Sequence, residues 1–146
     1  MIAQTIQLAL APVFVLVAIG GILNILSHRL GRVVDRSRTL QGSHSATKGM
    51  EHDMIVREIR MTDHRLTLLN RAILLLVISG LTIGTTVVLL FLAEFAHVNM
   101  QAVAAGTFIV AVLFLMAALL LFLQETRLAT AALKIPETYL ELERKL

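Results

Sequence analysis

The chain has 146 residues, of which 57% are hydrophobic, and its mean hydropathy is +0.81. This composition is too apolar for an ordinary soluble domain, and the length suits a single domain. The chain has no cysteine, which excludes disulfides, thiolate metal sites and cysteine nucleophiles. The formal net charge is +3. The basic residues are segregated beside apolar runs, so we interpret them as a membrane-topology signal and expect no nucleic acid partner.

Three uncharged apolar runs are each long enough for a membrane-crossing helix, which needs about 20 residues. They cover approximately residues 4–27, 72–93 and 102–123. The sequence therefore predicts an all-α integral membrane protein with three transmembrane helices in one membrane domain, 1–146. The first residues carry no Lys or Arg, so we expect the first span to be retained and not cleaved as a signal peptide.

The basic residues predict the orientation of these spans. Nine of the 13 Lys and Arg residues lie between Arg29 and Arg71, and the other four lie in the tail 124–146. The N-terminus and the connection 94–101 contain none. By the positive-inside rule we expect a multi-pass protein of the bacterial cytoplasmic (inner) membrane, with the N-terminus outside and the C-terminal tail in the cytoplasm.

The segment 28–71 has helical character on both sides of a break between Gly42 and Gly49. We expect it to extend the first two spans as a cytoplasmic helical hairpin; an amphipathic segment lying on the membrane surface is the alternative. We expect the third helix to continue to about Lys134 and to stop at Pro136, with a short amphipathic helix over 137–146.

Small and polar residues form a stripe at three-to-four spacing along the first span. This first-span stripe comprises Gln4, Gln7, Ala11, Phe14, Ala18, Gly21, Asn24 and His28. Such a stripe should face another helix or water, because polar groups are costly in lipid. Two interpretations stay open: tight helix packing, or the lining of a pore in a homo-oligomer with a ring of Phe14 as constriction. Pro12 predicts a kink, for packing or as a gating hinge.

The second and third spans differ in how they should pack. Gly80 and Gly84 form a GxxxG pattern, which lets helix backbones approach closely. The third span is nearly all aliphatic and is expected to form the lipid-facing rim of an assembly.

Charged residues flank the spans at both ends. Arg29, Arg32, Arg36 and Arg38 are expected to set topology and contact anionic headgroups, or to form a positive ring at the inner mouth of an oligomer, which would favour anions. Glu94 and His97 form either an exposed interfacial pair or a site for a cation or proton. The histidine spacing predicts no metal site, and the sequence contains no cofactor or nucleophile motif.

The string from Arg29 to Arg38, Arg-Leu-Gly-Arg-Val-Val-Asp-Arg-Ser-Arg, resembles a bacterial membrane family catalogued as domain of unknown function 2721. The resemblance extends over about residues 11–133. Asn70, before Arg71, departs from the pair of arginines typical of that family. The resemblance implies a small protein of the bacterial cytoplasmic membrane and no particular activity.

These observations favour a homo-oligomeric membrane assembly with ion-channel or pore-like activity. The alternative is a structural or accessory subunit that scaffolds a larger complex through its basic hairpin and binds an unidentified protein partner. No enzymatic reaction and no cofactor are expected. Anionic lipid headgroups on the cytoplasmic side are the expected lipid partners.

Overall fold

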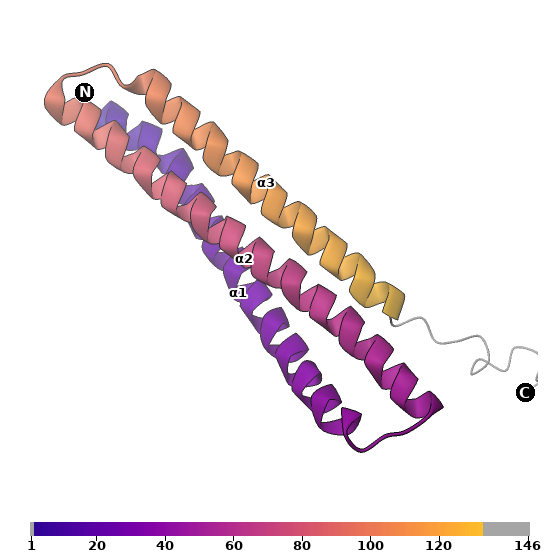
Figure 1. The fold of residues 1–146 in the computed structure, drawn as a ribbon. Helices are drawn as coiled ribbons and strands as arrows, with labels where there is room; N and C mark the ends of the chain where they lie inside the picture. The colour runs from indigo at the N-terminus through magenta and orange to yellow at the C-terminus, as the bar shows by residue number, and fades with distance from the viewer. Residues whose placement is uncertain (1, 133–146) are drawn as a thin grey trace, which may run out of the picture.

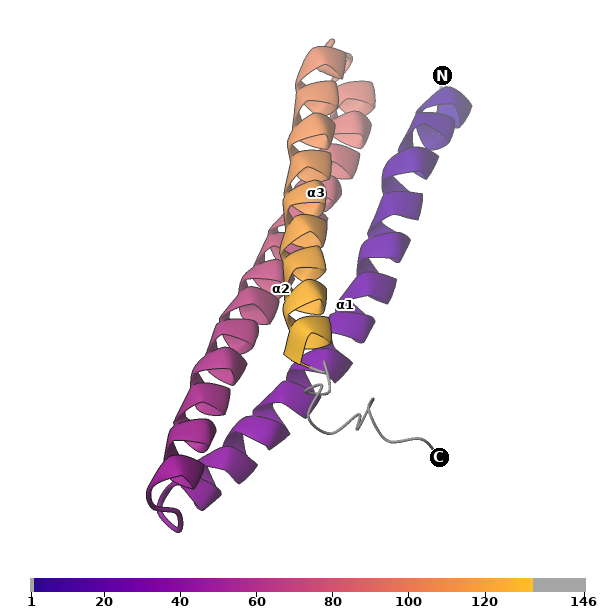
Figure 2. The ribbon, with the colours of Figure 1, turned by 90° about the vertical axis from the view of Figure 1, so that its right-hand side faces the viewer.

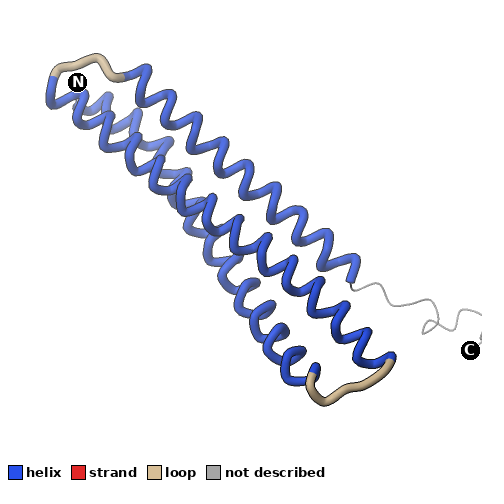
Figure 3. Tube along the Cα trace, in the orientation of Figure 1, coloured by secondary structure: helices blue, strands red, loops and turns tan. Residues whose placement is uncertain are grey.

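The computed structural model describes residues 2–132 and contains three long helices joined by short connections (Figure 1, Figure 3). The helices are α1 (Ile2–His44), α2 (Met50–Ala96) and α3 (Gln101–Ala132). Each contains a window long and apolar enough to cross a membrane, which confirms the predicted all-α architecture with three such helices. The expected stop at Pro136 and the helix over 137–146 lie outside the described residues.

The first two helices are much longer than a membrane span. At 1.5 Å per residue, the 43 residues of α1 and the 47 of α2 measure about 65 and 70 Å. A bilayer core is about 30 Å thick. Both helices continue without interruption from their apolar windows to the connection 45–49, and α1 also continues through Pro12. The break expected from Gly42 therefore begins later, after His44.

The two ends of the bundle are distinguished by their connections. The α1–α2 end carries residues 45–49, where Gly49 has φ +70, a left-handed value that suits glycine. The α2–α3 end carries residues 97–100 and the N-terminus of α1. The two longer helices project beyond the last described turn of α3 at the α1–α2 end (Figure 1).

α2 is the central helix, because α1 and α3 both pack along it and have little backbone contact with each other. Buried side chains recur every seven residues. On α1 they include Thr5, Pro12, Ile19, Leu26, Val33 and Leu40, and on α3 they are Ala104, Ala111, Ala118 and Glu125. A seven-residue repeat keeps one seam facing the partner helix, as in a left-handed coiled coil. The small alanines allow α3 to lie close to α2.

Most of the apolar surface has no partner within the chain. Only 17%, 22% and 11% of the most apolar windows of α1, α2 and α3 are buried. On α3 the uncovered face carries large aliphatic side chains, including Ile109, Leu113, Met116 and Leu120. A surface of this kind suits a lipid environment.

Candidate functional site: an ionic layer between the three helices

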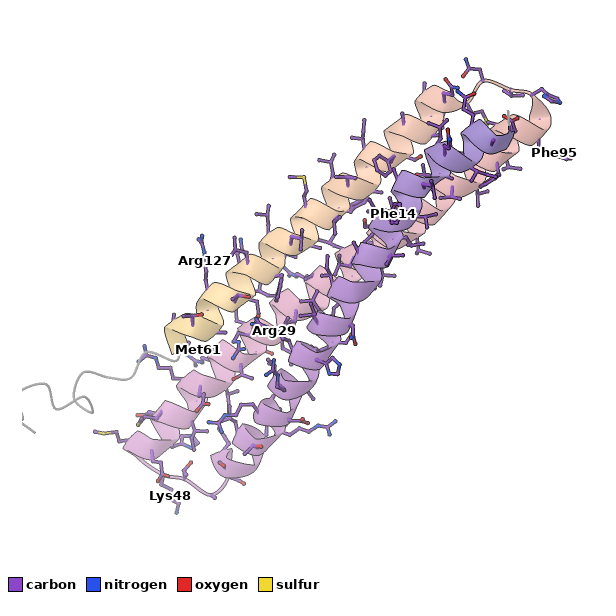
Figure 4. All side chains as sticks on the ribbon, turned by 180° about the vertical axis from the view of Figure 1, so that it is seen from behind. Phe14, Arg29, Lys48, Met61, Phe95 and Arg127 are labelled. Carbon is purple, nitrogen blue, oxygen red and sulfur yellow. The ribbon has the colours of Figure 1, made fainter. Side chains whose placement is uncertain are left out.

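Three charged side chains, one from each helix, meet in the interior of the bundle. Glu125 of α3 has no exposed surface. Arg29 of α1 donates from Nη1 to its Oε2 at 2.6 Å, and Arg65 of α2 donates from Nε and Nη2 to its Oε1 at 3.0 and 2.9 Å. We call Arg29, Arg65 and Glu125 the ionic layer; Figure 4 shows Arg29 where the three helices are close together.

The heptad repeat explains why these residues meet. Glu125 occupies the seam position that Ala104, Ala111 and Ala118 occupy in the preceding repeats of α3. Arg65 lies seven residues before the fully buried Ala72 of α2, on the same seam. Arg29 lies one turn after the buried Leu26 of α1, so its long side chain reaches α3 across the surface of α2.

Further contacts hold the Arg29 guanidinium. Its Nη1 also donates to Thr126 Oγ1 at 3.0 Å, and its Cζ lies 5.0 Å from the centroid of the Phe122 ring. A cation over an aromatic face is stabilised by the ring quadrupole. These two neighbours of Glu125 orient Arg29 toward α3, and its bonds to Glu125 and Thr126 form a polar link between α1 and α3.

The positive and negative groups of the ionic layer differ in number and in exposure. Two guanidiniums share one carboxylate, so the layer carries a net positive charge. The side chains of Arg29 and Arg65 are 28% and 27% exposed, whereas that of Glu125 is 0% exposed. A buried carboxylate is tolerated only when it is paired and hydrogen-bonded, and such a pair selects one helix register more than it adds stability.

Two polar contacts continue the α2–α3 seam toward the α2–α3 end. The buried Ser79 hydroxyl donates to the Ala111 carbonyl at 2.7 Å, and Thr86 Oγ1 lies 2.9 Å from Thr107 Oγ1. Hydroxyls bonded between helices favour close approach in an apolar environment. Together with the ionic layer they give α3 one defined position along α2.

All eight residues of the first-span stripe are exposed in the single chain. Most of them form two rows that each repeat every seven residues, as the buried seam does: Gln4, Ala11 and Ala18 directly precede seam residues, whereas Gln7, Phe14, Gly21 and His28 follow seam residues by two. Gln4 and Ala11 border a groove shared with α2 and α3. Residues further along, such as Gly21, Asn24 and His28, lie on the side of α1 away from the buried Ile19 and Leu26. Figure 4 shows Phe14 on the surface of α1.

The two glycines of the GxxxG pattern have different surroundings. A Cβ on Gly80 would lie 3.6 Å from Leu16 Cδ1 and 3.8 Å from Ile19 Cγ2, so Gly80 faces α1 within the chain. A Cβ on Gly84 would meet nothing within 4 Å. Of the two glycines, Gly80 is the one at a helix contact within residues 2–132.

The four arginines of the Arg29–Arg38 string also have different surroundings. Arg29 belongs to the ionic layer. Arg36 donates from Nε at 2.8 Å and from Nη2 at 2.5 Å to Glu58 Oε1, across α1 and α2 in an exposed position. Arg32 and Arg38 are exposed on α1.

Sequence reasoning did not identify Glu125 or Arg65 as site residues. The predicted spans leave Glu125 in the tail 124–146, and Arg65 is one of nine basic residues between Arg29 and Arg71. The signal that was available is the seven-residue series Ala104, Ala111, Ala118, Glu125, in which a carboxylate takes a core position.

Comparisons with known proteins leave one informative match. Neither the curated proteins nor the solved structures include a match to this chain. A family model described as protein of unknown function (DUF2721) matches residues 9–135, a range that contains all three members of the ionic layer. The chain therefore belongs to the DUF2721 family.

Proposed function

We propose that the protein is a homo-oligomeric assembly of the bacterial cytoplasmic membrane whose α1 helices line a pore-like path. The α1–α2 end and the C-terminal tail face the cytoplasm, and the N-terminus lies outside. The distribution of Lys and Arg supports this orientation, because every one of them lies at or beyond the cytoplasmic ends of the three apolar windows.

The observation that carries the proposal is the uncovered polar face of α1. Gln7, Asn24 and His28 are exposed in a helix whose apolar window is long enough to span a membrane, and neither α2 nor α3 covers them. Amide and imidazole groups facing hydrocarbon are costly and need a polar neighbour or water. A second copy of α1 or a water-filled path between copies would supply it.

Two features support a pore over a dry interface. The Phe14 side chain is 69% exposed, and a ring of such side chains would form the hydrophobic constriction of a gate. At the inner end of the stripe, Arg32 is exposed on α1 one turn beyond His28, so an assembly of several copies would place several guanidiniums there. A surplus of guanidiniums at a pore mouth favours anions.

Cysteine cross-linking tests the assembly directly, because the chain has no cysteine of its own. We expect Gly21→Cys in native membranes to form a disulfide-linked dimer on oxidation. The matched control Leu113→Cys, on the exposed aliphatic face of α3, should stay monomeric. A monomeric mass of the detergent-extracted protein, together with no Gly21→Cys cross-link, contradicts the proposal.

Conductance across a planar bilayer tests the pore. Purified protein should conduct, with anions preferred, and Asn24→Phe should reduce the conductance by blocking the path. Leu113→Phe, which adds the same ring on the uncovered side of α3, should leave it unchanged. An oligomer that does not conduct would contradict the proposed pore but not the proposed homo-oligomeric assembly.

The projecting α1–α2 end favours a second candidate function, that of an accessory subunit. Met50 and Met54 are 83% and 68% exposed near the tip, in a segment otherwise rich in charge. Exposed methionines adapt to many partner surfaces. This role would be supported if another protein co-purifies with the chain at fixed stoichiometry and the double substitution Met50→Glu/Met54→Glu abolishes the co-purification. Neither candidate assigns a chemical reaction to the chain.

A further inference from the structure

A groove opens at the α2–α3 end, where the N-terminal half of α1 lies apart from α3 (Figure 2) but stays in contact with α2. Its volume is about 430 Å³, within the range of about 300–1,000 Å³ typical of small-molecule pockets. Its lining is mostly apolar, with three polar side chains. The lining residues are Gln4, Leu8, Ala11, Pro12, Thr86, Leu90, Gln101, Ala104, Ala105 and Phe108.

A second, polar cavity of about 310 Å³ continues the groove toward the α2–α3 connection. The two share Leu8, Leu90 and Gln101 in their walls. The polar cavity is also lined by Thr5, Glu94, His97 and Asn99. An apolar groove followed by a polar mouth matches an amphiphile with its tail inward and its head at the membrane surface.

The charge of the mouth selects the kind of head. Glu94 is half-buried and accepts a hydrogen bond from Thr5 Oγ1 at 3.1 Å, which holds its carboxylate at the meeting point of α1 and α2. No Lys or Arg occurs in the sequence between Ala72 and Gln124. An anionic head would meet a carboxylate with no arginine or lysine to offset it, whereas an ammonium group would complement it.

The rest of the mouth suits a zwitterion. The amide side chains of Asn99 and Gln101 can donate hydrogen bonds to a phosphate. An ammonium carried a few bonds from that phosphate would then reach Glu94, to which it can donate hydrogen bonds of the stronger, charge-assisted kind. A trimethylated ammonium cannot donate them. Because the groove lies in the membrane-spanning part of the helices, acyl chains are the ligand at hand.

We propose that this groove binds a phospholipid with a primary ammonium headgroup, of the ethanolamine type, with one acyl chain between α1 and α3 and the ammonium on Glu94. The site is independent of the pore, since it uses the α2–α3 pair and the flank of α1 toward α3. It gives the outer half of α1 a lipid that holds it against α3 where protein contact is sparse.

Native mass spectrometry of the delipidated, detergent-solubilised full chain tests the site. Phosphatidylethanolamine, phosphatidylcholine and phosphatidylglycerol with identical chains are titrated separately under the same conditions. We expect the ethanolamine lipid to bind at least about tenfold more tightly than either of the other two lipids. A tenfold difference in affinity corresponds to about one charge-assisted hydrogen bond. Equal retention of all three overturns the proposal.

Two variants and their controls locate the bound lipid. Glu94→Gln, which can still accept from Thr5, should remove the preference for ethanolamine, whereas Glu51→Gln at the other end should keep it. Ala105→Trp fills the groove and should abolish binding; Val103→Trp, exposed beside it but outside the groove, should not. Circular dichroism confirms that each variant is folded. Unchanged selectivity in folded Glu94→Gln, or unchanged binding in folded Ala105→Trp, contradicts the assignment.

Discussion

Removing the buried carboxylate of the ionic layer should destabilise the bundle far more than removing an exposed one. Glu125→Gln keeps the size of the side chain but leaves two guanidiniums without a counter-charge. The carboxylate accepts three hydrogen bonds, at 2.6, 2.9 and 3.0 Å, from the two arginines. Bonds to a charged group contribute about 1.5–3 kcal/mol each, so their nominal sum is about 4.5–9 kcal/mol.

Two effects reduce that sum. Arg29 and Arg65 are 28% and 27% exposed and recover part of their hydration, and the glutamine oxygen still accepts one bond. We therefore expect a loss of about 3 kcal/mol in the free energy of unfolding, at the low end of the range for broken buried pairs, or more than about 100-fold in the folding equilibrium.

Reversible unfolding in mixed micelles of a mild detergent and dodecyl sulfate, followed by circular dichroism, measures this loss. Glu58→Gln is the matched control. It breaks the Arg36–Glu58 pair, which also joins α1 to α2 but whose side chains are 56% and 45% exposed, so it should cost about 0–1 kcal/mol. Equal stabilities of Glu125→Gln and Glu58→Gln would refute the reasoning.

A triple replacement separates the effect of unpaired charge from the effect of packing. Arg29→Met, Arg65→Met and Glu125→Leu together exchange the ionic layer for apolar side chains of similar volume, which is often neutral or stabilising. We expect it to recover most of the stability that Glu125→Gln loses. A triple variant as unstable as Glu125→Gln would show that the loss comes from packing at position 125 and not from unpaired charge.

Two further substitutions test the helix contacts by the same unfolding assay. Gly80→Ala should be neutral or should stabilise the protein by up to about 1 kcal/mol. The new Cβ would meet Leu16 at an ordinary contact distance of 3.6 Å, and alanine loses less backbone entropy on folding than glycine. A clear destabilisation would show that the two backbones need a glycine at this position. Ala111→Leu should destabilise the protein by about 1–3 kcal/mol, because this seam position is fully buried against α2. The control Ala102→Leu, exposed on the same helix, should not destabilise it. Equal effects of the two substitutions would contradict the tight alanine seam.

The sequence alone determined the class of the protein. Apolar composition over about 20 residues is a local property, so three apolar helices could be predicted from the chain and were confirmed. The family resemblance was confirmed as well, because the Arg29–Arg38 string lies within the matched range. The orientation in the membrane also follows from local charge, and it stays a prediction.

The tertiary structure decided which residues meet. Glu125 lies 96 residues from Arg29 and 60 from Arg65, and no local pattern brings them together before the relative register of three helices is known. The same register gave Gly80 a helix neighbour and left Gly84 without one. It also divided the first-span stripe between a groove and a face turned away, because one row of the stripe directly precedes the buried seam residues and the other follows them by two residues, so the two rows point in different directions around the helix. Composition acts residue by residue along the chain, whereas a site made by three helices depends on where each seam lies, and only packing sets that.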